Sequence, residues 1–131
     1  MAYDPRFVRG ILEFNRGDFF EAHERIEAYW HEVSGPHREF VQAVIQAAVC
    51  LHHLVSGNRV GAEKVRASCG RHFGAFRPRH GGIDVDGLLA GIDAAMAAPV
   101  VDARALPVID LDPPPTVEEA SAAAALEEEV L

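Results

Sequence analysis

The sequence has few cysteines, a single tryptophan and no long apolar run. Cys50 and Cys69 form no CxxC spacing, so neither a disulfide framework nor a zinc knuckle is indicated, and a reduced cytoplasmic setting is expected. The first residues do not combine a basic segment with an apolar stretch, as a signal peptide would. The most apolar segment, residues 41–55, is interrupted by glutamine and histidine and is shorter than the roughly 18 to 20 residues of a membrane span. We therefore expect a soluble cytoplasmic protein that does not enter the membrane.

Charge is unevenly distributed along the chain, whose net charge is −8. Residues 1–80 contain 11 lysines and arginines against 9 acidic residues, whereas residues 81–131 contain Arg104 alone against 11 acidic residues. A basic segment at residues 59–79 has little aromatic interleaving, so we interpret it as a solvated face. The acidic balance argues against a protein dedicated to nucleic-acid binding.

Helical periodicity runs through most of the chain. Phe7, Ile11 and Phe14 follow the spacing of one helix face, and Asp18 with Glu21 fits a capping box at the start of the next helix. Helices are predicted over residues 5–15, 18–33, 36–56, 58–76 and 84–98. With 49% hydrophobic residues, a chain of this length supports one core. The predicted fold is all-α, a single irregular bundle of about five helices with a central antiparallel hairpin of the second and third helices.

The composition changes after the fifth predicted helix. We predict a helical domain over residues 1–98 and an acidic, Ala- and Pro-rich C-terminal tail over residues 99–131. The pair Thr116 and Glu119 is typical of a capping box and would start a short helix over residues 116–131. The low complexity of this tail leaves two alternatives open, disorder or docking on a neighbouring surface.

Two central helices carry polar residues at positions next to the core. In the helix at residues 18–33, His23 and Glu27 lie between the apolar arc and Phe20, so both are predicted to be at least partly buried. The helix at residues 36–56 is apolar around most of its circumference. Its polar stripe consists of Gln42, Gln46 and His53. In an antiparallel hairpin, His23 would lie across from residues 50–53 and Glu27 across from Gln46.

Two interpretations of this set remain open. Imidazole and carboxylate groups are ligands for a divalent ion such as Zn, Mn, Fe or Ni, so convergence of these residues would make a metal site. Alternatively, the same side chains hydrogen-bond one another in a buried network, or the stripe of the third helix simply faces solvent. The His23-Glu24 pair is no zincin motif, because that motif needs a second histidine where Glu27 stands.

A longer motif identifies a family. Residues 14–30 follow the pattern FNxGxFFEAHExxExxW, which ends at Trp30, and blocks at residues 45–48, 52–53, 57–62 and 82–85 follow in order. These blocks resemble a small helical prokaryotic family catalogued as domain of unknown function 309. The resemblance covers roughly residues 7–97.

The resemblance implies a function only in outline, because members of this family have been labelled predicted metal-dependent hydrolases without an assigned substrate. Carried over to this chain, the label points to Glu21, His23, Glu24, Glu27, Gln46 and His53. Glu21, Gln46 and Trp30 would complete the polar cluster around the ligands. Glu21 falls on the outer face of its helix, where a role near the positive helix end is the simpler interpretation.

Three hypotheses follow. The first is a metal-dependent hydrolase with His23, Glu27 and His53 as ligands, and with Glu24 and Glu27 as catalytic groups acting on metal-bound water. The second is a non-enzymatic binding or structural module, with a homodimer left open, whose Glu/His/Gln cluster is a buried network. The third is a pocket for a small anionic molecule near Arg38 and the basic segment.

Overall fold

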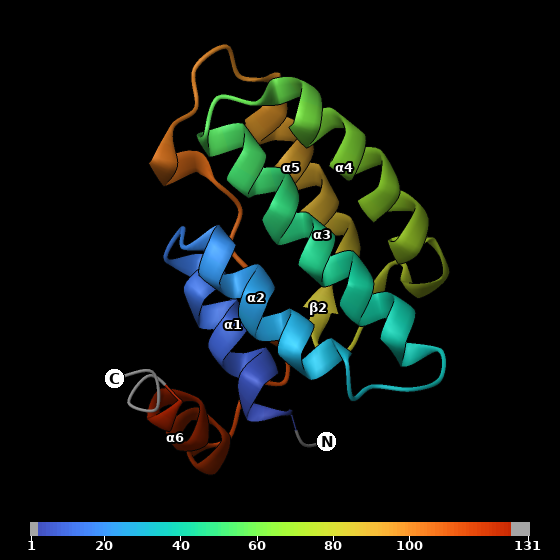
Figure 1. The fold of residues 1–131 in the computed structure, drawn as a ribbon, viewed down its shortest axis with the longest axis vertical. Helices are drawn as coiled ribbons and strands as arrows, with labels where there is room; N and C mark the ends of the chain where they lie inside the picture. The colour runs from blue at the N-terminus through green and yellow to red at the C-terminus, as the bar shows by residue number, and fades with distance from the viewer. Residues whose placement is uncertain (1–2, 127–131) are drawn as a thin grey trace.

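The computed structural model describes residues 3–126. Within them the chain forms six α-helices, two short 3-10 helices and one small hairpin of strands (Figure 1). In chain order these are α1 (Pro5–Asn15), α2 (Phe19–Trp30), α3 (His37–Val55), α4 (Arg59–Phe73), η1 (Gly74–Phe76), β1 (Arg79–His80), β2 (Ile83–Asp84), α5 (Val85–Ala97), η2 (Ala103–Ala105) and α6 (Val117–Ala125). The predicted all-α bundle is confirmed.

The first two helices form a tight pair. Asp4 caps α1 by accepting a hydrogen bond from the Arg6 backbone N–H at 2.8 Å, and Pro5 occupies the first turn, where it costs no hydrogen bond. A Cβ atom at Gly10 would collide with the Ile26 side chain, so glycine allows the close crossing of α1 and α2. The predicted capping box at the start of α2 is wrong, because the Asp18 side chain makes no capping hydrogen bond.

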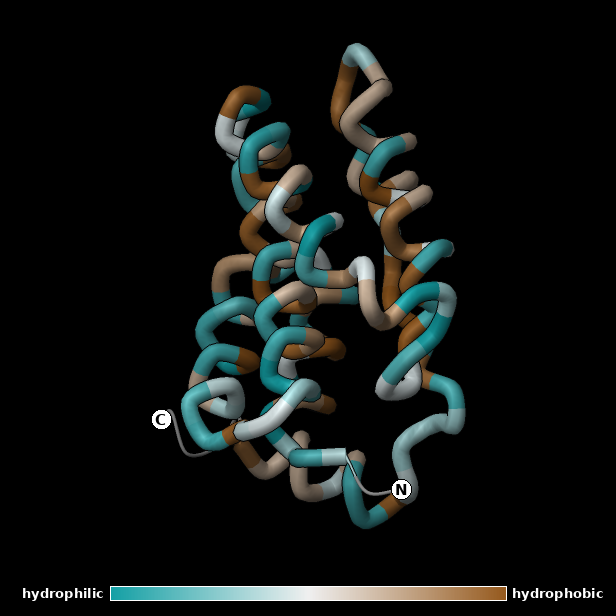
Figure 2. Tube along the Cα trace, turned by 90° about the vertical axis from the view of Figure 1, so that its right-hand side faces the viewer, coloured by the Kyte–Doolittle hydropathy of each residue, from teal (hydrophilic) through white to brown (hydrophobic). Residues whose placement is uncertain are grey.

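The central element is α3, which lies between α2 and α4 with α5 behind it (Figure 1). The Phe20 ring, at the start of α2, lies 5.6 Å from the His52 ring near the end of α3, so the two helices are antiparallel as predicted. Ten of the 19 α3 residues are buried, and Figure 2 shows apolar positions recurring along the turns of the helices. The core therefore forms around α3.

A small β-hairpin replaces the loop expected at residues 77–82. Arg79 pairs with Asp84 and His80 pairs with Ile83 in antiparallel register. Gly81 and Gly82 both have positive φ angles, of 57° and 84°, which a two-residue hairpin turn of this type requires. The Gly-Gly dipeptide was thus a hairpin signal that periodicity alone did not reveal.

The C-terminal segment packs on the helices. The Asn15 side chain donates to the Ile109 carbonyl oxygen at 2.8 Å and accepts from the Ile109 N–H at 2.7 Å, and Ile109 is buried. The predicted Thr116/Glu119 capping box starts α6, which packs against α1. Of the two alternatives left open, docking is observed for residues 99–126; the end of the predicted last helix, residues 127–131, lies outside the described residues.

The division into a domain at residues 1–98 and a tail at residues 99–131 stays a prediction, since the described part of the tail shares the core through Ile109 and Ala123. None of the helices within residues 3–126 has the length and apolar character needed to cross a bilayer.

Candidate functional site

The predicted metal ligands on α2 do not meet in the interior. His23 is half-buried, and its Nδ1 lies 2.5 Å from the Phe20 carbonyl oxygen one turn earlier. The Glu27 side chain is 50% exposed, and its Oε1 lies 3.9 Å from Nε2 of His31 on the same helix. The predicted burial of Glu27 is wrong. The buried face of α2 runs through Phe19, Ala22 and Ile26, and one further residue turns the side chain by about 100°, out of the core.

The third predicted ligand, His53, lies toward α4. Its Nδ1 accepts a hydrogen bond from the side-chain amide Nδ2 of Asn58, the N-cap residue of α4, at 3.4 Å. Residues 3–126 contain no group of three or more histidine, cysteine or acidic side chains placed to hold a metal ion. His23, Glu27 and His53 therefore do not fit a metal site in this arrangement.

The other two predicted acidic residues face a different pocket. Glu21 and Glu24 line a charged pocket of about 440 Å³ between α1, α2 and the end of α6. Its remaining lining residues are Arg6, Glu13, Arg25, Ala28 and Leu126. Glu24 is exposed and lines this charged pocket, whereas His23 and Glu27 do not.

A buried ion pair in this region was not predicted. Glu13 and Arg9 are only 7% and 5% exposed, and their side chains approach to 3.8 Å on α1. Arg25 of α2 lies 3.3 Å from the same Glu13 carboxylate. A buried carboxylate without a cation is costly, so the pairing of Glu13 with Arg25 favours the packing of α1 against α2. The i, i+4 spacing of two opposite charges was the available sequence signal.

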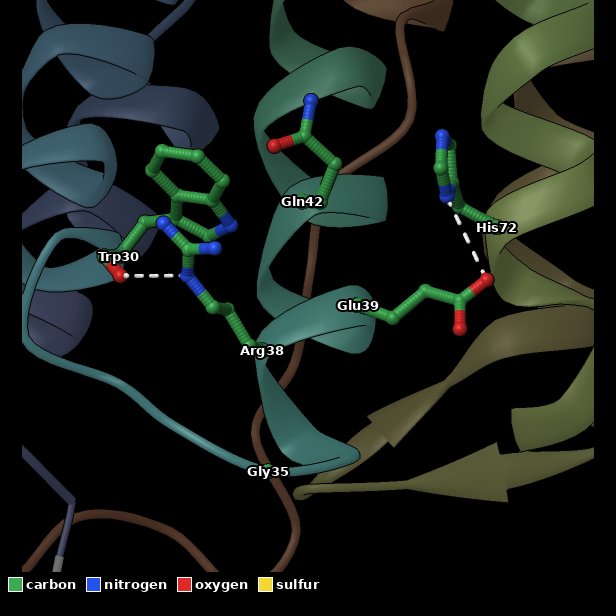
Figure 3. A pocket seen from close by; sticks show the side chains of 6 residues that line it. All are labelled: Trp30, Gly35, Arg38, Glu39, Gln42 and His72. Atoms are coloured by element: carbon green, nitrogen blue, oxygen red, sulfur yellow. Dashed lines mark hydrogen bonds and ion pairs between the residues drawn. The ribbon is translucent and has the colours of Figure 1, made fainter.

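A second pocket lies on the outer side of α3, between α2 and α4. It has a volume of about 450 Å³ and is lined by Trp30, Gly35, Arg38, Glu39, Gln42 and His72 (Figure 3). The end of α2 supplies Trp30, the first turns of α3 supply Arg38 and Gln42, and α4 supplies His72. We call this the α2–α3–α4 pocket.

One wall of the α2–α3–α4 pocket is a stacked pair. The guanidinium carbon of Arg38 lies 3.7 Å from the centre of the Trp30 ring, and Arg38 Nε donates to the Trp30 carbonyl oxygen at 3.5 Å. Together these contacts hold the guanidinium plane against the indole. Within residues 3–126, the terminal nitrogens of Arg38 make no hydrogen bond or ion pair with protein atoms.

Buried polar atoms without hydrogen bonds gather around this pocket. Among the described residues, Trp30 Nε1 and His72 Nδ1 of the pocket lining, and Gln46 Oε1 outside it, are shielded from solvent and have no hydrogen-bond partner. His72 Nδ1 lies 3.5 Å from Glu39 Oε1, an ion-pair distance without hydrogen-bond geometry. In Figure 3 the Trp30 Nε1 atom points into the pocket toward Gln42. The pocket therefore presents polar groups that the protein itself does not satisfy.

The sequence indicated part of this pocket. Trp30 belonged to the predicted polar cluster, Gln42 to the polar stripe of α3, and Arg38 to the anionic-ligand hypothesis, whereas Gln46 of the cluster lies outside the pocket lining. His72 was missed, because it lies among the buried Cys69 and Phe73 in the apolar pattern of α4.

Comparisons with known proteins agree with the motif. Residues 7–65 match the family model described as domain of unknown function (DUF309). The uncharacterized protein YpuF of Bacillus subtilis (strain 168) is similar, with 34% identity over 68 residues. That alignment covers 50% of this chain but only 39% of the relative's length. The predicted resemblance is confirmed over residues 7–65, which match the model of the family described as domain of unknown function (DUF309).

Proposed function

We propose that this protein is a small-molecule binding module whose site is the α2–α3–α4 pocket. The single observation that supports it is the Trp30 indole N–H, which is buried at the pocket wall and has no partner within residues 3–126. An indole nitrogen can only donate, so its partner must be an acceptor. Leaving such a donor unpaired costs about 1–3 kcal/mol, a cost that an acceptor on a ligand would remove.

The dimensions and lining of the pocket support the same proposal. Ligand pockets typically measure about 300–1,000 Å³ and combine apolar walls with a few convergent polar groups. The α2–α3–α4 pocket, at about 450 Å³, combines the indole with an arginine, a glutamine and a histidine. Three different helices contribute these groups, so ligand binding would also stabilise their packing.

The family resemblance implied a metal-dependent hydrolase, and the arrangement of its residues does not support that function. His23, Glu27 and His53 do not form a ligand group, and Glu24 faces the other pocket. We therefore derive no reaction through a metal. Metal binding is tested by elemental analysis of protein purified without a histidine tag. About one divalent ion per chain would restore the hydrolase hypothesis. No ion, with no stabilisation by added Zn or Mn, would exclude this ligand set.

The binding proposal can be tested through Trp30 itself, because it is the only tryptophan in the chain. Its fluorescence and its indole N–H resonance therefore report on this pocket alone. A fragment library is screened against the full chain by NMR, and binders are expected to shift the Trp30 indole resonance. Trp30→Phe keeps an aromatic ring but removes the donor, and it should weaken a binder about tenfold or more, measured by calorimetry.

Tyr29→Phe is the matched control, because it also removes a donor from an aromatic residue, and the Tyr29 ring packs against Phe7 of α1, outside the pocket lining. It should leave affinity unchanged. If no fragment shifts the indole resonance, or if Trp30→Phe binds as tightly as the wild type, this pocket is not the binding site.

A further inference from the structure

We infer that the ligand of the α2–α3–α4 pocket is a small organic carboxylate, held by the terminal nitrogens of Arg38 and the indole N–H of Trp30. This inference rests on the proposed binding function and adds the chemical class of the ligand. It follows from three features of the pocket: the direction of its free donors, the fixed orientation of the arginine, and the sum of its charges.

Arg38 is already oriented as an anion-binding group. Of its five N–H donors, the one on Nε is directed at the Trp30 carbonyl oxygen, which leaves four on the two terminal nitrogens. The guanidinium is a planar fork that matches the two oxygens of a carboxylate. Stacking 3.7 Å above the indole restricts this otherwise flexible side chain, so a ligand has less conformational entropy to remove when it binds.

The Trp30 indole adds a second donor beside the first. Because Arg38 stacks on the Trp30 ring, the guanidinium N–H groups and the indole Nε1 lie within one small region at the same end of the pocket (Figure 3). Within residues 3–126, Nε1 is shielded from solvent and has no hydrogen-bond partner. Two converging donor groups with no acceptor between them favour an oxygen anion.

The charge of the lining favours a singly charged anion over a doubly charged one. Arg38 is the only arginine or lysine of the lining, and Glu39 is its only acidic residue. Glu39 extends toward His72, at 3.5 Å, and away from Arg38 (Figure 3). A carboxylate is matched by the one arginine. A phosphate dianion would bring one more negative charge than a carboxylate into a pocket that already contains the Glu39 carboxylate. We therefore favour a carboxylate over a phosphate.

The middle of the pocket suits the rest of such a molecule. Gln42 lies between the Arg38/Trp30 end and the Glu39/His72 end, and its amide offers both donors and an acceptor (Figure 3). At about 450 Å³, the pocket is near the lower end of the usual range for ligand sites. The inferred ligand is thus a compact acid with its carboxylate at the α2 end.

The test compares an acid with its own amide. 3-Phenylpropionate, 3-phenylpropionamide and inorganic phosphate are titrated into the full-length chain, and the Trp30 indole N–H resonance and fluorescence are followed. We expect the acid to shift the indole resonance and to bind at least tenfold more tightly than the amide. Phosphate is expected to bind more weakly than the acid.

Variants assign the effect to Arg38. Arg38→Gln should lower the affinity for the acid at least tenfold. Its affinity for the amide should stay within about twofold of the wild-type value. The affinity of Arg38→Lys for the acid should lie between those of Arg38→Gln and the wild type, because an ammonium keeps the charge without the planar fork. Arg71→Gln is the matched control, since Arg71 is an exposed arginine of α4 outside the pocket lining and its loss should change neither affinity.

Each contrary result has a distinct meaning. Equal affinity of acid and amide, with an unchanged Arg38→Gln variant, would overturn the carboxylate assignment while leaving the binding function intact. Phosphate binding more tightly than the acid would also overturn it. If neither these probes nor any library fragment perturbs Trp30, both the ligand class and the proposed function fail.

Discussion

The guanidinium carbon of Arg38 lies 3.7 Å from the centre of the Trp30 ring, and this contact joins the end of α2 to the first turns of α3. The connection between these helices contains Gly35, whose φ angle of 76° suits glycine. The stack therefore closes the hairpin at its turn while it forms one wall of the α2–α3–α4 pocket. The closure of the hairpin and the proposed ligand site therefore involve the same pair of side chains.

Loss of the stack should have a modest, measurable cost. Arg38→Ala removes a cation–π contact at an exposed position, so the free energy of unfolding should fall by about 0.5–1 kcal/mol. The emission of Trp30 should also shift to longer wavelength, because water reaches the uncovered ring. Stability is best measured by urea unfolding followed by circular dichroism. An Arg71→Ala control should change neither quantity, and an Arg38→Ala protein identical to the wild type would contradict the stack.

Gln46 should be replaceable by an apolar residue. Its Oε1 is buried without a hydrogen-bond partner among the described residues, so the folded state gains little from this acceptor. Gln46→Leu should leave the free energy of unfolding unchanged or raise it by about 1 kcal/mol. Gln46→Glu should lower it, because a carboxylate would be buried in the same place. A large loss of stability in Gln46→Leu would show that Oε1 has a partner after all.

His37 and His80 should make stability depend on pH. His37 Nδ1 lies 3.1 Å from His80 Nε2, and burial, followed by the charge of His80, lowers the pKa of His37 below its ordinary value of 6.5. Below pH 6.5 the unfolded chain therefore takes up a proton that the folded chain resists. Stability is complete above that pH and falls as the pH decreases toward the lowered pKa of the folded state.

This dependence is measured as the free energy of unfolding between pH 7.5 and pH 5. His37→Gln should flatten the slope, because the group with the lowered pKa is gone. The exposed His31 provides the control, and His31→Gln should keep the slope of the wild type. A wild-type protein equally stable across this range would show that the two rings are not in contact in solution.

Asn15 should hold the C-terminal segment to the helices. Its amide pairs with both the N–H and the carbonyl oxygen of Ile109, so Asn15→Ala leaves two backbone groups without partners. We expect a loss of about 1–3 kcal/mol and faster hydrogen exchange of the Ile109 amide. Asn15→Asp keeps the acceptor for the Ile109 N–H and loses only the donor, so its effect should be smaller. Equal exchange rates in all three proteins would exclude this role.

The same change at two glutamates should have very different effects on stability. Glu13 is buried between Arg9 and Arg25, so Glu13→Gln should lower the free energy of unfolding by roughly 3 kcal/mol. Glu27 is 50% exposed, so Glu27→Gln should change it by less than about 0.5 kcal/mol. Thermal and urea unfolding of both variants provide the comparison. A costly Glu27→Gln would restore the buried cluster predicted on α2.

Much of the local structure could be predicted from the residues. The bounds of α1 agree with the prediction, and α3, α5 and the start of α4 agree within about two residues. These features depend on groups close together in the chain, such as Asn58, whose side chain accepts from the Gly61 N–H, and the capping box of Thr116 and Glu119. Antiparallel packing of α2 and α3 also followed from their short connection.

The site depended on information that is absent from local patterns. Whether His23, Glu27 and His53 converge is decided by the rotation of each helix about its axis, and one residue turns a side chain by about 100°. That rotation is set by how several helices fill one core, as where Ile26 packs against Gly10. The rotation that this packing imposes on α2 places the Glu27 side chain in solvent.

The docking of the C-terminal segment and the pocket depend on contacts between residues far apart in the chain. Asn15 meets Ile109, and Trp30 meets Arg38 and His72 around one pocket, although nothing in the periodicity of any single helix links them. Helix formation needs only neighbours within four positions, so the amino-acid order suffices to specify it. A pocket needs side chains from α2, α3 and α4 at one place, and only the packing of the whole bundle brings them there.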